Sequence, residues 1–530
     1  MERSLYRDHI ENRLRDFPEL EQYLFIRGFV ACDTYLDPNG YPFFGKWKYF
    51  RIEGFHFYIH PKQTWYYVDS PVSCFLIGHA YDPFTMETDE TAILRRMALC
   101  TQDVDRIKIL NSLTGVFTMG WFEKDRMILV GDCAGMQTTY YGCVKGKIYF
   151  SSHMQLIGDI CDLEPSDYVK KLTSYRFYHY YGAYLPGDLS SYPSVRRIVP
   201  NTLIERKGTD FKIKRFYPEV PLDCCSGEES YREKLAYIAD LLHKNMILIT
   251  QKWNQPAISM SGGMDSKCSL AAANGLYDRF QYFSYISMAG ERIDAEAAHT
   301  IAEAIHIPHR IDFISSSDED FPGVDEFRAI LQHNFGNIGR NNDNDVRKRV
   351  YYTQYGHCTF DVEVKSWVSE IGRANYYKKF GLKHMPERLS PRQMSTMYKL
   401  FLHNRSLLKE TDAVFEEYIN RVHFDDIFNY DASDMFLWEV RYGSWGGQVI
   451  TSEQRLPFDI TIPYNNRLLL EAFLTLPLER RIADQVHADL IHMLNAEIDK
   501  TGVSVTNYNE TKSRMIKEKV YYLVNSALPF

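Results

Sequence analysis

One six-residue stretch decides the fold of this chain: Ser261-Gly262-Gly263-Met264-Asp265-Ser266. It directly follows an apolar run, 256–260, which the sequence predicts to be a buried strand. Two consecutive glycines let the backbone turn sharply and approach a ligand closely. The amides of such a turn, with the start of the following helix, bind anions. We therefore predict a strand, a phosphate-binding loop and a helix in immediate succession.

The polar residues of this loop have distinct expected roles. We predict that the hydroxyls of Ser261 and Ser266 and the amides of Gly262 and Gly263 hold phosphate oxygens. Asp265 would repel phosphate unless a cation lay between them, so it is the predicted Mg²⁺ ligand. In the alternative, this is a plain glycine-rich turn and Ser266 only caps the helix. Six fitting positions in a suitable context favour the phosphate loop.

The segments after the loop alternate between helices and short apolar runs. The sequence predicts a short helix through Ala271, a second strand at 280–286, a helix at 294–306 and a third strand at 310–313. Strands joined by helices in this order predict a parallel, nucleotide-binding sheet, with further helices after it.

The first 217 residues have a different pattern. Short β-rich runs such as 57–59 and 127–130 are separated by Gly, Asp, Asn or Pro, and one helical pattern runs from Thr91 to about Leu99. This mixture predicts an α+β domain with antiparallel sheets. The expected division is an amino-terminal domain at 1–217, a linker at 218–229 and an α/β domain at 230–530.

Composition narrows the class of protein. A chain of 530 residues with 45% hydrophobic and 25% charged residues is typical of a globular protein with at least two domains. The net charge of −8 argues against a nucleic-acid surface over the whole molecule. We expect no membrane span and no signal peptide, and ten scattered cysteines indicate a reducing cytoplasm. A homo-oligomer is left open.

The loop resembles the Ser-Gly-Gly-x-Asp-Ser signature of the ATP-pyrophosphatase families, which split ATP into AMP and pyrophosphate. Other segments resemble the glutaminase domain of class B asparagine synthetases, namely 113–117, 130–135, 140–142, 149–152 and 182–187. The resemblance implies a glutaminase-like antiparallel β sandwich with helices, followed by a synthetase domain that uses ATP and Mg²⁺. It also implies that Ile286, Ser287 and Met288 contact adenine through their backbone.

The amino terminus departs from that family. A working glutaminase of this class has cysteine as its first mature residue, whose thiolate attacks glutamine while its α-amine is the base. Here Met1 is followed by Glu2, and the first cysteine is Cys32, which we expect to be a buried strand residue. The amino-terminal domain is therefore expected to be catalytically degenerate, as in β-lactam synthetases and lasso-peptide cyclases, which this pattern resembles.

A second departure concerns the other metal-binding acid. Asparagine synthetases carry Ser-Gly-Glu-Gly-Ser-Asp-Glu about a hundred residues after the loop, where this chain has the segment 365–376, without the glycine-rich part. The resemblance implies that Glu370 takes the metal and catalytic role. Alternatively, Glu370 only pairs with Arg373 on a helix. Both readings stay open at this point.

Weaker candidates come from the resemblance or from position. Lys512 lies where related synthetases place a catalytic lysine, although a solvated surface lysine is the simpler reading. Asp294 and Glu296 are expected to open the second crossover helix, where acids also favour the helix dipole. The stretch 453–459, with the nearby Arg441, matches a late family motif and is expected to be structural.

Together these observations predict an ATP-dependent, AMP-forming carbon–nitrogen ligase. It would adenylate a small-molecule or peptide carboxylate and transfer the acyl group to an amine. The alternatives are a glutamine- or ammonia-dependent amidotransferase of the asparagine synthetase type, an ATP-pyrophosphatase acting on a non-carboxylate, and a pseudo-synthetase scaffold. The sequence identifies neither the acid nor the amine.

Overall fold

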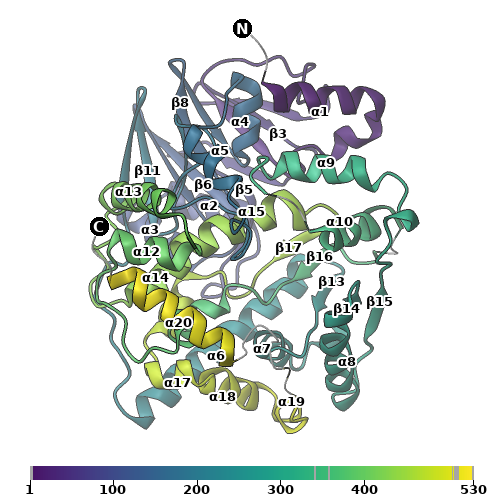
Figure 1. The fold of residues 1–530 in the computed structure, drawn as a ribbon, viewed down its shortest axis with the longest axis vertical. Helices are drawn as coiled ribbons and strands as arrows, with labels where there is room; N and C mark the ends of the chain where they lie inside the picture. Colours follow the sequence, from purple (N-terminus) through teal and green to yellow (C-terminus); the bar gives the residue numbers. More distant parts are fainter. Residues whose placement is uncertain (1–3, 340–341, 356–357, 504, 506–511, 528–530) are drawn as a thin grey trace.

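The computed structural model describes residues 4–339, 342–355, 358–503, 505 and 512–527. Two antiparallel six-stranded sheets are formed by the first part of the chain, and a parallel five-stranded sheet by the second. In Figure 1 the antiparallel strands gather at the upper left and the parallel strands at the right, with helices around both. The expected combination of an α+β part and an α/β part is thus present.

The two antiparallel sheets face each other as a sandwich. One has the order β10-β8-β9-β1-β3-β2 and the other β12-β11-β7-β6-β5-β4. Alternate side chains of both sheets, such as Phe57, Phe75 and Phe150, form a buried apolar layer between them. The strands are β1 (Phe29–Cys32), β2 (Lys48–Ile52), β3 (Phe55–Ile59), β4 (Trp65–Val68), β5 (Ser73–Tyr81), β6 (Thr114–Glu123), β7 (Arg126–Gly131), β8 (Tyr140–Val144), β9 (Lys147–Ser151), β10 (Val195–Arg197), β11 (Thr202–Lys207) and β12 (Asp210–Arg215).

Helices cover the sandwich more fully than the sequence predicts. The expected helix is confirmed as α2 (Glu90–Ala98), which packs with α3 (Asp103–Ser112) on the outer face of the second sheet. The prediction of a single helix here was wrong, because α1 (Leu5–Asp16), α4 (Met154–Cys161) and α5 (Asp167–Thr173) are also present. In α1 only two side chains are buried, and in α4 nearly all are, so neither has a clear helical period.

The parallel sheet has the order β15-β14-β13-β16-β17, with β13 at its centre. The three predicted strands are confirmed as β13 (Pro256–Ser259), β14 (Gln281–Ile286) and β15 (Arg310–Phe313). Sequence reading missed β16 (Val362–Val364) and β17 (Asp459–Thr461), which have three residues each and lie far along the chain. Runs this short carry no periodic signal.

The second part of the chain is rich in helices, some of which, such as α13 (Arg405–Val422), contact the sandwich instead of the parallel sheet. The helix after β14 begins at Ala289 rather than at Asp294. The prediction that Asp294 and Glu296 lie in its first turn was therefore wrong. The helices are α6 (Glu228–Lys252), α7 (Met264–Ala272), α8 (Ala289–Ala304), α9 (Val324–Asn334), α10 (Asp343–Val350), α11 (Asn375–Phe380), α12 (Pro391–Tyr398), α13 (Arg405–Val422), α14 (Ala432–Phe436), α15 (Gly447–Val449), α16 (Arg467–Leu474), α17 (Leu478–Ile482), α18 (Gln485–Leu494), α19 (Ala496–Lys500) and α20 (Lys512–Ala527). Among the described helices, none has the length and apolar character that crossing a bilayer requires.

Buried polar contacts join the sandwich to the parallel-sheet region. The Asn465 amide donates to Asp132 Oδ1 at 2.9 Å, and its carbonyl oxygen accepts from the Ala134 amide at 2.8 Å. The Arg455 guanidinium donates to Asp459 at 2.8 Å and to Gln137 of the sandwich. The expectation that the stretch 453–459 is structural is therefore confirmed for its buried arginine and aspartate.

Candidate functional site

The predicted phosphate loop lies between β13 and α7, at the carboxyl edge of the parallel sheet. Ligands of open α/β sheets bind at this edge. Hydrogen bonds within the loop stabilise the turn. The Ser261 amide donates to Ser266 Oγ at 3.0 Å, and the Gly263 amide donates to Ser261 Oγ at 3.3 Å. Both hydroxyls keep a proton to donate, so the turn is formed while ligand-binding capacity remains.

The two glycines of the loop differ in how tightly they are packed. A Cβ on Gly262 would lie 2.2 Å from Val505 Cγ2 and 2.7 Å from the Cβ of Ala297 on α8. A Cβ on Gly263 would meet only Ser261 Oγ, at 3.3 Å. Gly262 is therefore required for the close approach of α8 to the loop.

This difference gives a paired prediction. Gly262→Ala should lower the free energy of unfolding by roughly 1–3 kcal/mol, because α8 and Val505 must shift to admit the methyl group. Gly263→Ala should change it by less than about 0.5 kcal/mol. Chemical denaturation of both variants checks this, and equal losses would contradict the packing account.

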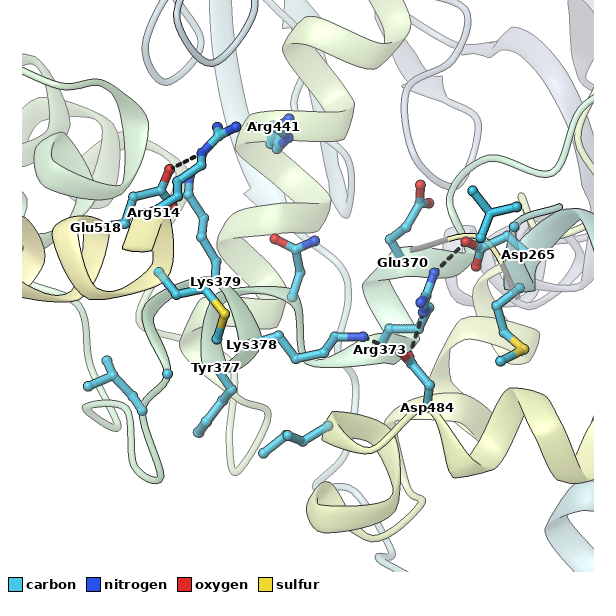
Figure 2. A pocket seen from close by; sticks show the side chains of 18 of the residues that line it. Asp265, Glu370, Arg373, Tyr377, Lys378, Lys379, Arg441, Asp484, Arg514 and Glu518 are labelled. Carbon is cyan, nitrogen blue, oxygen red and sulfur yellow. Dashed lines mark hydrogen bonds and ion pairs between the residues drawn. The ribbon is translucent and has the colours of Figure 1, made fainter. Parts of the chain in front are cut away.

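A cavity of about 910 Å³ opens beside the loop. Its wall contains Gly262, Gly263, Met264 and Asp265 from the loop and helix α7, but not Ser261 or Ser266. Figure 2 shows charged side chains from several elements converging on it. The basic members are Lys267, Arg373, Lys378, Lys379, Arg441 and Arg514, and the acidic ones are Asp265, Glu370, Asp484 and Glu518. An excess of basic side chains in a protein of net charge −8 favours an anionic ligand.

Asp265 is held by one cation, one hydroxyl and a nearby imidazole. It forms an ion pair with Arg373, accepts from Ser369 Oγ at 2.6 Å, and lies 3.6 Å from His487 Nε2. Burial lowers the pKa of His487 to about 4, so this imidazole is neutral near pH 7. Arg373 also donates to Asp484 at 2.8 Å, so it would keep one partner if Asp265 turned to another cation.

Glu370 faces the same cavity from the 3-10 helix η5 (Ser369–Arg373). Burial, and then the charge of Asp265, raise the pKa of its carboxyl to about 7. Its Oε2 atom is buried and has no hydrogen-bond partner. The alternative ion pair with Arg373 is not formed, because that guanidinium pairs with Asp265 and Asp484.

The backbone around Glu370 is strained. Val368, just before η5, has φ of 78°, and Ala374, just after it, has φ of 49°. Non-glycine residues adopt the left-handed region at a cost of about 1–3 kcal/mol each, and such strain clusters at functional sites. The segment thus turns through two left-handed residues, neither of which is a glycine.

Asp265 and Glu370 suit a magnesium ion. Mg²⁺ prefers carboxylate oxygens and is bound through one or two of them together with substrate phosphates. In this structure the Arg373 guanidinium balances the charge of Asp265, at the position that a magnesium ion would take. The Oε2 atom of Glu370 has no hydrogen-bond partner and could bind such an ion. Within the described residues there is no group of three or more His, Cys, Asp or Glu side chains that could hold a metal alone.

The remaining predicted residues lie outside the cavity wall. Ile286 ends β14 and Met288 precedes α8, at the same sheet edge as the loop. The Ser287 amide between them donates to Glu291 at 2.8 Å. Lys512 begins α20, but its side chain falls outside the described part of the structure.

Sequence reading missed most of the basic wall. Lys378 and Lys379 on α11, Asp484 before α18 and Tyr181 from the sandwich part line the cavity. Arg441, which we had taken as structural, also lines it, from the π-helical stretch η6 (Leu437–Gly446). The run 376–379, with two tyrosines before two lysines, was the one available signal.

Cys32 is a buried strand residue, as expected. Its side chain is on β1 with no exposed surface, and burial raises the pKa of its thiol to about 12. A thiol in this state is a poor nucleophile. We expect Cys32→Ala to leave glutamine hydrolysis at the same background level as in the unaltered protein, and to cost about 1 kcal/mol of stability. Glutamate release from glutamine, measured on both proteins, checks this; robust release lost in the variant would contradict it.

No known protein family and no curated protein matches this chain. Several solved structures align with it, among them these two. One is glutamine phosphoribosylpyrophosphate amidotransferase from B. subtilis complexed with ADP and GMP, at 10% identity and a TM-score of 0.24, covering 58% of this chain and 63% of that one. The other is an allosteric regulatory enzyme of purine biosynthesis, at 10% identity and a TM-score of 0.24. The alignment covers 55% of this chain and 60% of that one. The chain spans about three fifths of the length of these structures, and likenesses this distant carry no argument about function.

Proposed function

We propose that this protein is an ATP-dependent, AMP-forming ligase, which adenylates a carboxylate and transfers the acyl group to an amine. The observation that carries the proposal is the loop 261–266, which joins a parallel strand to a helix and presents Asp265 to a cavity rich in basic side chains. Helix amino termini and glycine-rich turns bind phosphates at this edge of α/β sheets. The resemblance of the loop to the ATP-pyrophosphatase signature supports the choice of ATP.

In the first step, a carboxylate oxygen of the acid attacks the α-phosphorus of ATP, and the bond to the bridging oxygen of the leaving pyrophosphate breaks. The amides of Gly262 and Gly263 and the hydroxyls of Ser261 and Ser266 would hold the pyrophosphate oxygens. Asp265 and Glu370 would hold Mg²⁺, which neutralises phosphate charge when bound. Catalysis by such a site consists of positioning and electrostatic stabilisation.

In the second step, the amine nitrogen attacks the carbonyl carbon of the acyl-adenylate. The bond between that carbon and the phosphate oxygen breaks, AMP leaves, and the nitrogen gives up its proton. Because Cys32 is buried and has a raised thiol pKa, we expect the amine to come from solution or from the acid itself, not from glutamine hydrolysed by this chain.

One observation favours a second candidate, a non-catalytic scaffold. Arg373 already neutralises Asp265, as it would in a protein that has lost its metal. Against this, Arg373 has Asp484 as an alternative partner, and Glu370 lies beside Asp265 with a buried oxygen, Oε2, that has no hydrogen-bond partner. A protein with no ligand here would gain stability by losing Glu370.

The experiment that separates the two is a panel of carboxylic acids and amines incubated with ATP and Mg²⁺. The ligase releases AMP and pyrophosphate with at least one pair. A scaffold turns over no nucleotide with any of them, and release of ADP and phosphate would assign a different reaction.

A further inference from the structure

The cavity has a second, basic end away from Asp265. Figure 2 shows Lys379, Arg441 and Arg514 grouped apart from Asp265 and Glu370. We call this group, together with Tyr181, the basic end. Lys379 comes from α11, Arg441 from η6, Arg514 from α20 and Tyr181 from the sandwich part of the chain.

Two cations of the basic end lack an acidic partner. Arg514 pairs with Glu518 at 2.9 Å. In the described part of the chain, no carboxylate lies within ion-pair distance of Lys379 or Arg441. Instead, Lys379 Nζ lies 3.3 Å from the ring centroid of Tyr181, and the Arg441 guanidinium lies 5.1 Å from that of Trp445. Both cations are half-buried. Partly desolvated charges without a counter-ion are costly, so a ligand anion would stabilise this end of the cavity.

A hydrogen-bond donor is unused at the same place. The Tyr181 hydroxyl is buried and has no hydrogen-bond partner, and the same is true of Tyr376 on α11. Lys379 lies over both rings. Because buried polar groups are nearly always paired, an orphan hydroxyl beside a cavity indicates a missing ligand atom.

We propose that the basic end binds an oxyanion, a carboxylate or phosphate group, through Lys379, Arg441 and the Tyr181 hydroxyl. This oxyanion would be the second anionic group of the substrate acid, whose other carboxylate reaches the phosphate loop. The substrate class is then an acid with two anionic groups. Only this assignment to the substrate rests on the proposed function; the anion site itself does not.

The proton on Lys379 gives the site a pH signature. Burial, and then the charge of Arg441, lower the pKa of Lys379 to about 7, while Glu518 opposes this. The groups that face it from the elements packed around it are Arg441, Arg514, Glu518, Tyr181, Tyr376 and Lys399. Lys379 is therefore charged below about pH 7, while Arg441 is charged at any pH near neutral. Above pH 7 the amine of Lys379 is neutral, so anion binding must be accompanied by uptake of a proton from solution. The affinity for the anion should then fall by up to about tenfold per pH unit.

The test is calorimetric titration of succinate, glutarate and inorganic phosphate into the full chain at pH 6 and pH 8. We expect at least one probe to bind about tenfold or more tightly at pH 6, with proton uptake at pH 8. Lys379→Met should remove the tight binding. Lys379→Arg, which stays charged at both values, should bind without the Lys379-dependent proton uptake, and Tyr181→Phe should weaken binding severalfold. Lys409→Met, at an exposed lysine of α13, is the matched control and should behave like the unaltered protein.

The outcomes separate this inference from the proposed ligase. Asp265→Asn should keep the pH-dependent binding, since Asp265 lies at the other end of the cavity. The protein could bind anions in a Lys379-dependent way and yet never form AMP. That result would support the anion site and contradict only the proposed ligase activity. If no probe binds, or if Lys379→Met and Tyr181→Phe both bind as the unaltered protein does, the anion site is overturned. Melting curves of each variant check that it is folded.

Discussion

Asp265→Asn is expected to lower the rate of AMP formation by at least about 100-fold while leaving the fold intact. Replacing residues that only support a metal ligand already costs 10- to 100-fold, so loss of a direct ligand should cost at least as much. The asparagine side chain has nearly the same shape but carries no charge to balance a cation beside the pyrophosphate. The measurement is AMP release at saturating ATP and Mg²⁺.

Stability separates this effect from unfolding. Arg373 keeps its contact with Asp484 in the variant, and the Asp265 pair is partly solvated, so we expect a loss of only about 1 kcal/mol. Asp240→Asn is the matched control, because that exposed aspartate pairs with Lys244 on the surface of α6, away from the cavity wall. A variant at Asp265 that turns over at the normal rate would remove this residue from the proposed metal site.

Glu370→Gln should also lower AMP formation by about 100-fold, with the opposite effect on stability. The ordinary pKa of this carboxyl is 4.5, and in the folded protein burial and Asp265 raise it to about 7. The folded state therefore binds the proton more tightly than the unfolded state does. As a result, the free energy of unfolding falls as the pH rises from about 4.5 to about 7.

Glutamine does not titrate, so the free energy of unfolding of the variant does not fall with pH for this reason. We expect Glu370→Gln to be as stable as the unaltered protein below pH 4.5 and more stable above pH 7, by roughly 2–3 kcal/mol. Denaturation at pH 4 and pH 8, without ligand, checks the sign. A variant that is less stable at pH 8 and fully active would make Glu370 a structural residue.

The sequence predicted the loop 261–266 and its flanking strand and helix because their residues are contiguous. Strand, glycine turn and helix are specified by neighbours in the chain, so 256–272 could be predicted from local rules. The helix after β14 was placed late because Ala289 and Gly290 give no apolar period at its start. Strands β16 and β17 depend on pairing across about a hundred residues, which local pattern does not encode.

The basic end could not be predicted for a related reason. Tyr181, Lys379, Arg441 and Arg514 are scattered along the chain and meet only through tertiary packing. Taken singly in the sequence, each is indistinguishable from an ordinary aromatic residue or an ordinary surface lysine or arginine. The left-handed turns at Val368 and Ala374 were hidden too, because neither residue type indicates a positive φ.

The most direct test of the central claim is the fate of the carboxylate oxygen. An acid that supports turnover in the panel is prepared with ¹⁸O in its carboxylate, and the AMP formed from unlabelled ATP is analysed by mass spectrometry. Adenylation transfers one carboxylate oxygen to the α-phosphorus, so the account predicts AMP that is heavier by one ¹⁸O atom. Unlabelled AMP, or release of ADP in place of AMP, would contradict it.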